Sequence, residues 1–201
     1  MNLELLALPM ILLVSLTGVG LLVSIDWRVS IGALALQYLG VFVFVAMSWP
    51  IEMAIVKLVA GWMASVVLAL ANAGISERQS EGLGIISRRL FRLLAAGLVG
   101  LVIASAAPRI AVYMPAVAAE QFLGAGILIG LGLLHLGLTS GILHVILGLL
   151  TVLAGFEILY AAVESSVLVA GLLAVVNLGL ALVGAYLLVI PELVVAEEEL
   201  E

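Results

Sequence analysis

Cysteine is absent from this chain of 201 residues, and histidine occurs only twice. Without cysteine there is no disulfide, no thiolate metal site, no cysteine-ligated iron–sulfur cluster and no cysteine nucleophile. Two histidines are also too few for us to expect a protein-ligated metal centre. Charged residues make up only 10% of the chain, compared with about 25% in typical soluble domains. Few side chains are therefore able to do chemistry.

Apolar residues dominate instead. They make up 66% of the chain, and the mean hydropathy is +1.41. Soluble domains are only about 45–50% apolar, and a membrane-spanning helix needs about 20 mainly apolar residues. The sequence therefore predicts an all-α integral membrane bundle with seven spans, at residues 3–25, 29–48, 51–72, 90–107, 119–138, 142–163 and 167–190.

Short polar or proline-containing segments separate these spans. Asp26-Trp27-Arg28 and Ser48-Trp49-Pro50 each combine a polar break with an aromatic side chain of the kind found at membrane interfaces. Pro108 and Pro115 flank another connection. Pro191 is expected to close the last span, because proline interrupts the helical hydrogen-bond ladder.

A longer polar segment divides the chain. Residues 1–72 form a predicted three-helix segment, 73–89 a cytoplasmic loop, and 90–190 a four-helix segment. Residues 191–201 form an acidic tail that we expect to be a solvated end. This tail contributes much of the net charge of −6, which argues against nucleic acid as a partner.

The arginines predict the orientation in the membrane. With seven spans, only Arg109 lies on one side, and all the others lie on the opposite side: Arg28, Arg78, Arg88, Arg89 and Arg92. The positive-inside rule then places the N-terminus outside and the C-terminus in the cytoplasm, most simply in a prokaryotic cytoplasmic membrane. The acidic start, Met1 to Glu4, leads us to expect no cleavable signal peptide.

Glu157 lies in an uncharged, apolar run from Gly141 to Val163. A charge at the bilayer centre costs roughly 2.5 to 3.5 kcal/mol even on the mildest insertion scale, so such residues are usually functional. Glu164 follows two helical turns later, about 10 Å along the same face of a helix. The pair predicts a proton relay. The alternatives are a neutral Glu157 that hydrogen-bonds a neighbouring helix, and an interfacial Glu164 beside Ser165 and Ser166.

Lys57 is the second charged residue inside a predicted span. Its long stem either snorkels toward the outer surface near Glu52 or faces a carboxylate on another helix or a partner subunit. Glu52 itself lies roughly 140° away around the helix, so it is poorly placed for an intrahelical pair. We therefore group Lys57 with Glu157 as a candidate for proton transfer.

His135 and His144 flank a predicted cytoplasmic turn, Leu138 to Gly141. An imidazole at this place is able to deliver protons from the cytoplasm. The alternative is an interfacial histidine that hydrogen-bonds headgroups or water. Gln37 and Asn177 are uncharged and lie mid-span, where we expect them to make interhelical hydrogen bonds.

No catalytic motif is present. Gly124-x-Gly126 lies in a predicted membrane helix rather than after a strand, so it is not a phosphate-binding loop. Glycines within the spans are typical of helices that approach one another closely (Gly124, Gly126, Gly130, Gly132 and Gly137). We expect the chain alone to be non-catalytic.

Part of the sequence resembles a known family. Leu136-Gly137-Leu138-Thr139, then Gly155-Phe156-Glu157-Ile158 and Ala161-Ala162, resembles the K subunit of respiratory NADH:quinone oxidoreductase. In that family a Gly-Leu-Glu-Ile-like motif carries an intramembrane glutamate, so residues 119–190 would correspond to its three spans. The additional N-terminal spans resemble longer relatives in energy-converting membrane hydrogenases. There a basic residue precedes the K-like part, and Lys57 matches it.

The chain departs from this family in its last span. Gly179-Leu180-Ala181-Leu182 resembles the stretch that follows the family's second glutamate, but Val175 occupies the nearest matching position. Asn177 is the only polar neighbour. A proton path like that of the family therefore lacks one group, unless Glu164 or a partner supplies it.

The resemblance implies a membrane subunit of an ion-translocating redox complex, of the complex I or energy-converting hydrogenase type. Glu157 would carry a proton or couple charge, and the further proton-transfer candidates are Lys57, Glu164, His144 and His135. Iron–sulfur clusters, a metal centre or quinone would belong to partner subunits, and this chain would hold no cofactor. Two alternatives stay open: a non-catalytic scaffold subunit of such a complex, and a self-standing small transporter. A faint pattern shared by spans one to two and five to six keeps the transporter open.

Overall fold

Seven helices make up the part of the chain that the computed structural model describes, residues 4–73 and 85–198. They are α1 (Glu4–Val23), α2 (Trp27–Ala46), α3 (Ile51–Ala73), α4 (Ile85–Ala111), α5 (Ala119–Leu138), α6 (Ile142–Val163) and α7 (Val167–Glu198). All seven are long and apolar enough to cross a membrane, which confirms the predicted all-α, seven-span bundle of an integral membrane protein. The last three spans have the predicted bounds, and the first four differ by three residues or fewer.

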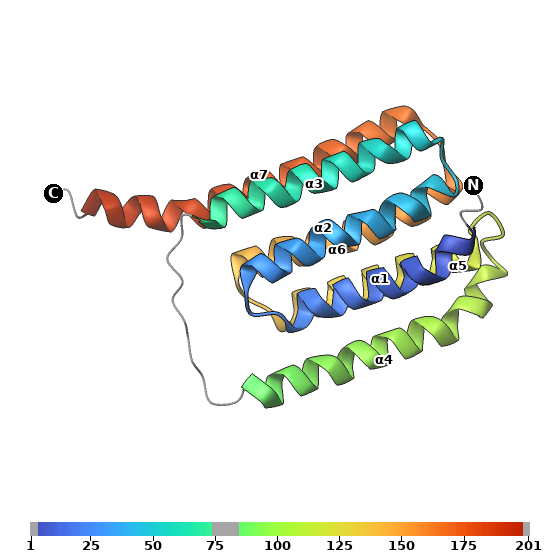
Figure 1. Ribbon diagram of the computed structural model, residues 1–201, viewed down its shortest axis with the longest axis horizontal. Helices are drawn as coiled ribbons and strands as arrows, with labels where there is room; N and C mark the ends of the chain where they lie inside the picture. Colours follow the sequence, from blue (N-terminus) through green and yellow to red (C-terminus); the bar gives the residue numbers. More distant parts are fainter. Residues whose placement is uncertain (1–3, 74–84, 199–201) are drawn as a thin grey trace.

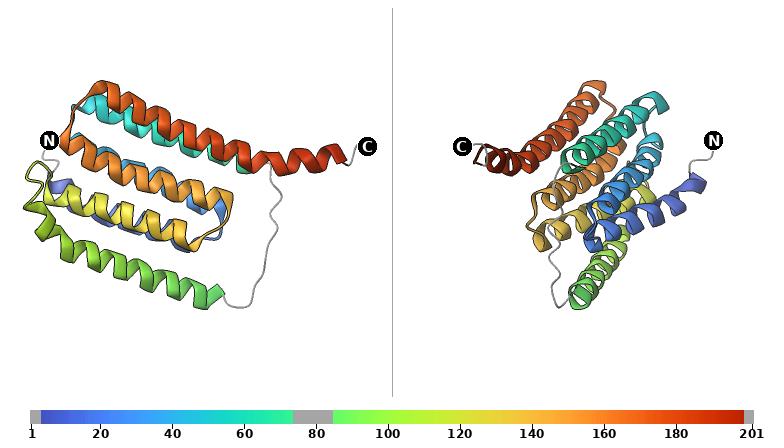
Figure 2. Two further views of the ribbon diagram at one scale, coloured as in Figure 1. Left: turned by 180° about the vertical axis from the view of Figure 1, so that it is seen from behind. Right: turned by 60° about the vertical axis from the view of Figure 1, so that its left-hand side comes forward.

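Six of the helices form two layers, and α4 lies outside them (Figure 1). One layer contains α1, α2 and α3, and the other contains α5, α6 and α7. Between the layers, α1 packs on α5, α2 on α6 and α3 on α7, as the right-hand view of Figure 2 also shows. Each helix of the first layer therefore lies against its counterpart in the second. The neighbours of α4 are α5 and, more lightly, α1.

The hydrophobic core lies between the layers. Its fully buried side chains come from both of them: Leu34, Val41, Phe44, Leu68, Leu128, Leu147, Leu150 and Ile158. Four of the five glycines noted in the sequence allow close approach between helices. A Cβ atom added to Gly124, Gly126, Gly130 or Gly132 would lie less than 3.0 Å from a neighbouring side chain. Gly137 has no such neighbour within 4 Å, so the close-packing interpretation is wrong at that position.

Three helix ends, two of α4 and one of α7, differ from the prediction. α4 begins at Ile85, inside the predicted loop 73–89, of which residues 74–84 lie outside the described part of the chain. Pro108 lies inside α4 rather than after it. α7 continues through Pro191 to Glu198 and extends beyond the other helices (Figure 1). A proline removes one hydrogen bond from the ladder, and here the helix continues on both sides of that gap. Residues 199–201 of the predicted tail are outside the described residues.

Trp49 connects two turns at one end of the bundle. It is only 4% exposed, so it does not face the membrane interface as the sequence predicts. Its Nε1 donates a hydrogen bond to the backbone oxygen of Glu164 at 2.8 Å, and its ring meets that of Tyr160 edge to face. The α2–α3 turn is thereby attached to the α6–α7 turn.

Candidate functional site

Lys57 on α3 and Glu157 on α6 form a salt bridge inside the bundle. Lys57 Nζ lies 2.8 Å from Glu157 Oε1, and each residue is 1% exposed. It is the only salt bridge within 4.0 Å among the residues that the structure describes. The snorkelling alternative for Lys57 is therefore wrong, and the expectation that it faces a carboxylate on another helix is confirmed.

Two further polar side chains complete a buried network around Glu157. Asn177 on α7 donates from Nδ2 to Glu157 Oε1 at 3.1 Å, and Tyr38 on α2 donates its hydroxyl to Asn177 Oδ1 at 2.8 Å. Both are 0% exposed. Four helices, α2, α3, α6 and α7, thus contribute one side chain each. The interhelical hydrogen bonding expected of Asn177 is confirmed.

Tyr38 is a residue that the sequence analysis missed. The available signal was a tyrosine in the middle of a span, because a buried phenolic hydroxyl usually has a hydrogen-bonding partner. Gly61 on α3 makes room for it. A Cβ atom at Gly61 would lie 2.2 Å from the Tyr38 ring. Lys57 is one turn earlier on the same face of α3, so this close approach also brings the lysine toward Glu157.

The two carboxylate oxygens of Glu157 have different environments. Oε1 accepts hydrogen bonds from both Lys57 and Asn177. Oε2 is buried and has no hydrogen-bonding partner among the described residues. A buried acceptor without a partner costs free energy, and a carboxylate oxygen of this kind is chemically able to accept a proton or a hydrogen bond from water.

Gln37 on α2 presents a similar orphaned atom. Its Nε2 donates to Thr151 Oγ1 on α6 at 3.4 Å, which confirms the expected interhelical contact. Its Oε1 is buried and has no partner in the described part of the chain. Thr151 donates its own hydroxyl hydrogen to the Leu147 backbone oxygen at 2.8 Å, so Gln37 Oε1 has no donor there.

His135 and His144 stack on each other across the α5–α6 turn. Their ring centroids are 5.6 Å apart, with an angle of 19° between the ring planes. His135 is only 2% exposed, so the interpretation of an interfacial histidine bound to headgroups is wrong for this residue. Neither of its ring nitrogens makes a hydrogen bond of good geometry with a described residue. His144 is half-buried and lines a pocket at the end of the bundle.

Glu164 lies outside this network. It follows the last residue of α6 with extended backbone angles, φ −139° and ψ 139°, and it is exposed. Its Oε1 accepts a hydrogen bond from the Ser165 backbone nitrogen at 3.1 Å. The expectation that Glu157 and Glu164 share one helical face is therefore wrong, because the helix ends before Glu164. The geometry is that of the interfacial alternative.

The network is suited to moving charge. It combines a carboxylate, an ammonium group, an amide and a phenol. Among the described residues, no group of three or more His, Cys, Asp or Glu side chains is placed to hold a metal ion. The assignment of all cofactors to partner subunits stays a prediction.

Comparison of the chain with protein-family models, curated proteins and solved structures finds no match.

Proposed function

We propose that this chain is a membrane subunit of an ion-translocating redox complex, of the complex I or energy-converting hydrogenase type. In this proposal Glu157 takes up and releases a proton, and Lys57 is its charge partner. The motif around Glu157 that resembles the K subunit supports this function. So does the place of Lys57, which corresponds to the basic residue of the longer relatives.

The observation that carries the proposal is the buried Lys57–Glu157 pair. Apolar residues of similar volume at a buried ion pair usually give equal or greater stability, so such a pair is poorly explained by stability alone. An intramembrane ionisable residue is by default a candidate for function. Here the two ionisable groups of opposite sign meet where four helices converge.

The geometry supports different roles for the two carboxylate oxygens of Glu157. Oε1 holds Lys57 and Asn177, whereas Oε2 is free to accept a proton. Protonation at Oε2 neutralises the carboxylate and leaves the Lys57 ammonium without a counter-charge. In a medium of low dielectric constant this change is felt strongly by other charges nearby. Conversely, a redox event in a partner subunit changes the charge near Glu157 and thereby changes how tightly Glu157 binds its proton.

The buried polar atoms of His135 and Gln37 that lack a hydrogen-bonding partner support a proton route to Glu157 from the arginine-rich end of the bundle. The His135 ring lies beside Gly148, and Gln37 contacts Thr151, so both mark successive turns of α6 before Glu157. The rise from residue 151 to residue 157 is about 9 Å, which exceeds one hydrogen bond. Water molecules between these groups would complete the route, and buried water commonly binds otherwise unpartnered polar atoms.

In this proposal Asn177, the only polar neighbour of Val175 in the sequence, takes the place of the family's second glutamate. Val175, the nearest match in sequence, is 66% exposed on α7, whereas Asn177 is 0% exposed and bonds Glu157 directly. An amide orients the carboxylate but does not itself titrate. In this chain the second charged group would therefore be Lys57.

The test is proton pumping by native membranes that carry Glu157→Gln, with assembly of the complex measured in parallel. We expect the complex to assemble and pumping to fall at least tenfold. Glu164→Gln is the matched control, because it makes the same chemical change at an exposed position on the same segment, and it should leave pumping unchanged. If Glu157→Gln leaves both assembly and pumping intact, the chain is a scaffold. If the chain purifies without redox partners, the result supports the alternative of a self-standing transporter.

A further inference from the structure

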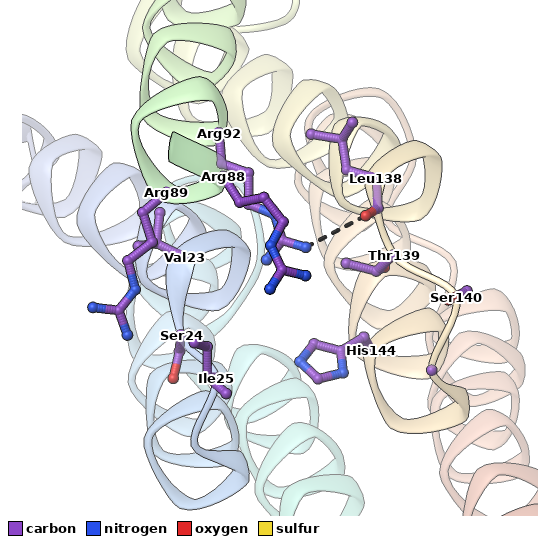
Figure 3. A pocket seen from close by; sticks show the side chains of 11 residues that line it. Val23, Ser24, Ile25, Arg88, Arg89, Arg92, Leu138, Thr139, Ser140 and His144 are labelled. Carbon is purple, nitrogen blue, oxygen red and sulfur yellow. Dashed lines mark hydrogen bonds between the residues drawn. The ribbon is translucent and has the colours of Figure 1, made fainter. Parts of the chain in front are cut away.

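Three arginines from the first turns of α4 line a pocket at one end of the bundle. Arg88, Arg89 and Arg92 face the α1–α2 turn at Ser24 and the α5–α6 turn with His144. The pocket has a volume of about 460 Å³. Figure 3 shows the guanidinium groups of Arg88 and Arg92 in the middle of the opening, with the His144 ring on one side.

The positive charge of this pocket has no counter-charge in the described part of the chain. No carboxylate lines it, and none of the three arginines has a salt bridge within 4.0 Å to a described residue. Arg92 donates hydrogen bonds to the backbone oxygens of Leu22 at 2.9 Å and Leu138 at 3.4 Å. It therefore holds the ends of α1 and α5 together, while Arg88 and Arg89 are exposed and available to a ligand.

An apolar surface continues from the arginines along α4. A second hollow of about 400 Å³ shares Arg88 and Arg92 with the first and is lined by Phe91 as well. Phe91 is 59% exposed, and Leu94 and Leu98 follow on the same face with 67% and 62% exposed. A ligand that spans both hollows needs an anionic group at one end and a long apolar body at the other.

We propose that this pocket binds an anionic phospholipid, with its phosphate at Arg88, Arg89 and Arg92 and its acyl chains along Phe91, Leu94 and Leu98. Guanidinium groups bind phosphate oxygens through paired, charge-assisted hydrogen bonds. Basic pockets between membrane helices at this depth are suited to such headgroups. α4 has few neighbours in the bundle, so a lipid at this place would attach it more firmly to α1 and α5.

The experiment measures lipid preference of the full chain in nanodiscs of phosphatidylcholine that contain spin-labelled phosphatidylglycerol. We expect the labelled lipid to associate preferentially with the wild-type protein. Arg88→Gln with Arg89→Gln should reduce this association by about fivefold per arginine, since each basic group near an anionic surface contributes about that factor. Arg92 is left intact in this variant because of its role in holding α1 and α5. Arg28→Gln is the matched control, since Arg28 lies over the Trp27 ring at the same end of the bundle and does not line the pocket.

A second arm separates a lipid from a soluble phosphate. Inorganic phosphate is added at millimolar concentration, and its binding is followed by calorimetry. If it binds with the same dependence on Arg88 and Arg89 and displaces the labelled lipid, the ligand is a soluble phosphate and the lipid assignment is wrong. Phe91→Ser should weaken lipid association, because Phe91 begins the apolar surface along which the acyl chains lie. Equal association of wild-type protein and the double-arginine variant, or an equal loss in Arg28→Gln, would overturn the site. A thermal unfolding curve confirms that each variant is folded.

Discussion

Lys57 Nζ and Glu157 Oε1 lie 2.8 Å apart, although 100 residues separate them in the sequence. They come from opposite layers of the bundle, α3 and α6, and each has only a protein environment around it. A charge on one is therefore balanced by the other and not by water. Loss of either partner leaves an isolated charge inside the membrane, which is far more costly than loss of both.

This relationship predicts a strongly non-additive double-mutant cycle. Glu157→Leu and Lys57→Met should each lower the free energy of unfolding by about 3 kcal/mol, because each leaves one buried charge unpaired. The double variant should regain most of that loss. Thermal unfolding of the purified chain in detergent measures the cycle. Additive losses would mean that the two residues do not form the pair.

Tyr38→Phe should lower stability by about 1 kcal/mol, the usual contribution of one interhelical hydrogen bond. The substitution removes only the hydroxyl that Asn177 accepts from. If Asn177 orients Glu157, the same variant should slow proton pumping in native membranes without loss of assembly. Unchanged stability and unchanged pumping together would show that the hydroxyl contributes nothing to the site.

Gly61→Ala and Gly97→Ala should have opposite effects. A Cβ atom at Gly61 meets the Tyr38 ring, and overpacking of this kind costs about 1 to 3 kcal/mol. Gly97 on α4 has no neighbour within 4 Å of its added Cβ, so alanine there should be neutral or stabilise by up to about 1 kcal/mol. Unfolding measurements on the two variants side by side test the packing. A tolerated Gly61→Ala would contradict the close approach of α3 to Tyr38.

Trp49→Phe should destabilise the protein more than Trp62→Phe. Both tryptophans donate from Nε1 to a backbone oxygen, Trp49 to Glu164 and Trp62 to Ala35. Trp49 is 4% exposed whereas Trp62 is 44% exposed, so only the first substitution removes a hydrogen bond and packing made by a buried indole. We expect a difference of about 1 kcal/mol in the free energy of unfolding. Equal losses would mean that the connection between the two turns is unimportant.

His135→Leu should separate stability from proton delivery. The His135 ring nitrogens make no hydrogen bond of good geometry with described residues, so a leucine of similar volume should change the unfolding free energy by less than about 1.5 kcal/mol. If the route along α6 passes His135, pumping in native membranes should nevertheless slow several-fold. Full pumping by the folded variant would remove His135 from the route, and a severe loss of stability would show that the imidazole has a structural role.

The membrane class and the spans could be predicted from composition and apolar run length alone. A helix that crosses a bilayer makes its backbone hydrogen bonds within its own segment, so a span can be recognised from the residues of that segment alone. The isolated charges at Lys57 and Glu157 were visible for the same reason, since an ionisable residue is conspicuous in an apolar span. Helix ends were predicted less well, as α7 shows by continuing through Pro191.

The partners of those residues could not be predicted in this way. Sequence left two places for the Lys57 ammonium, and it wrongly placed Glu164 on the same helical face as Glu157 because it extended the helical spacing one residue beyond Val163, where α6 ends. Tyr38 and Arg92 were missed because their importance lies in contacts with Asn177, Leu22 and Leu138, all on other helices.

The sequence by itself therefore determined the class of protein, the number of its spans and the few residues able to carry charge within them. Only the tertiary structure decided that Lys57, Glu157, Asn177 and Tyr38 meet and that Glu164 does not join them. The physical reason is that an apolar helix inserts into the membrane according to its own composition. Which helices pack together depends instead on how the side chains on their faces fit. That fit depends on contacts such as Gly61 against Tyr38, which link residues far apart in the chain.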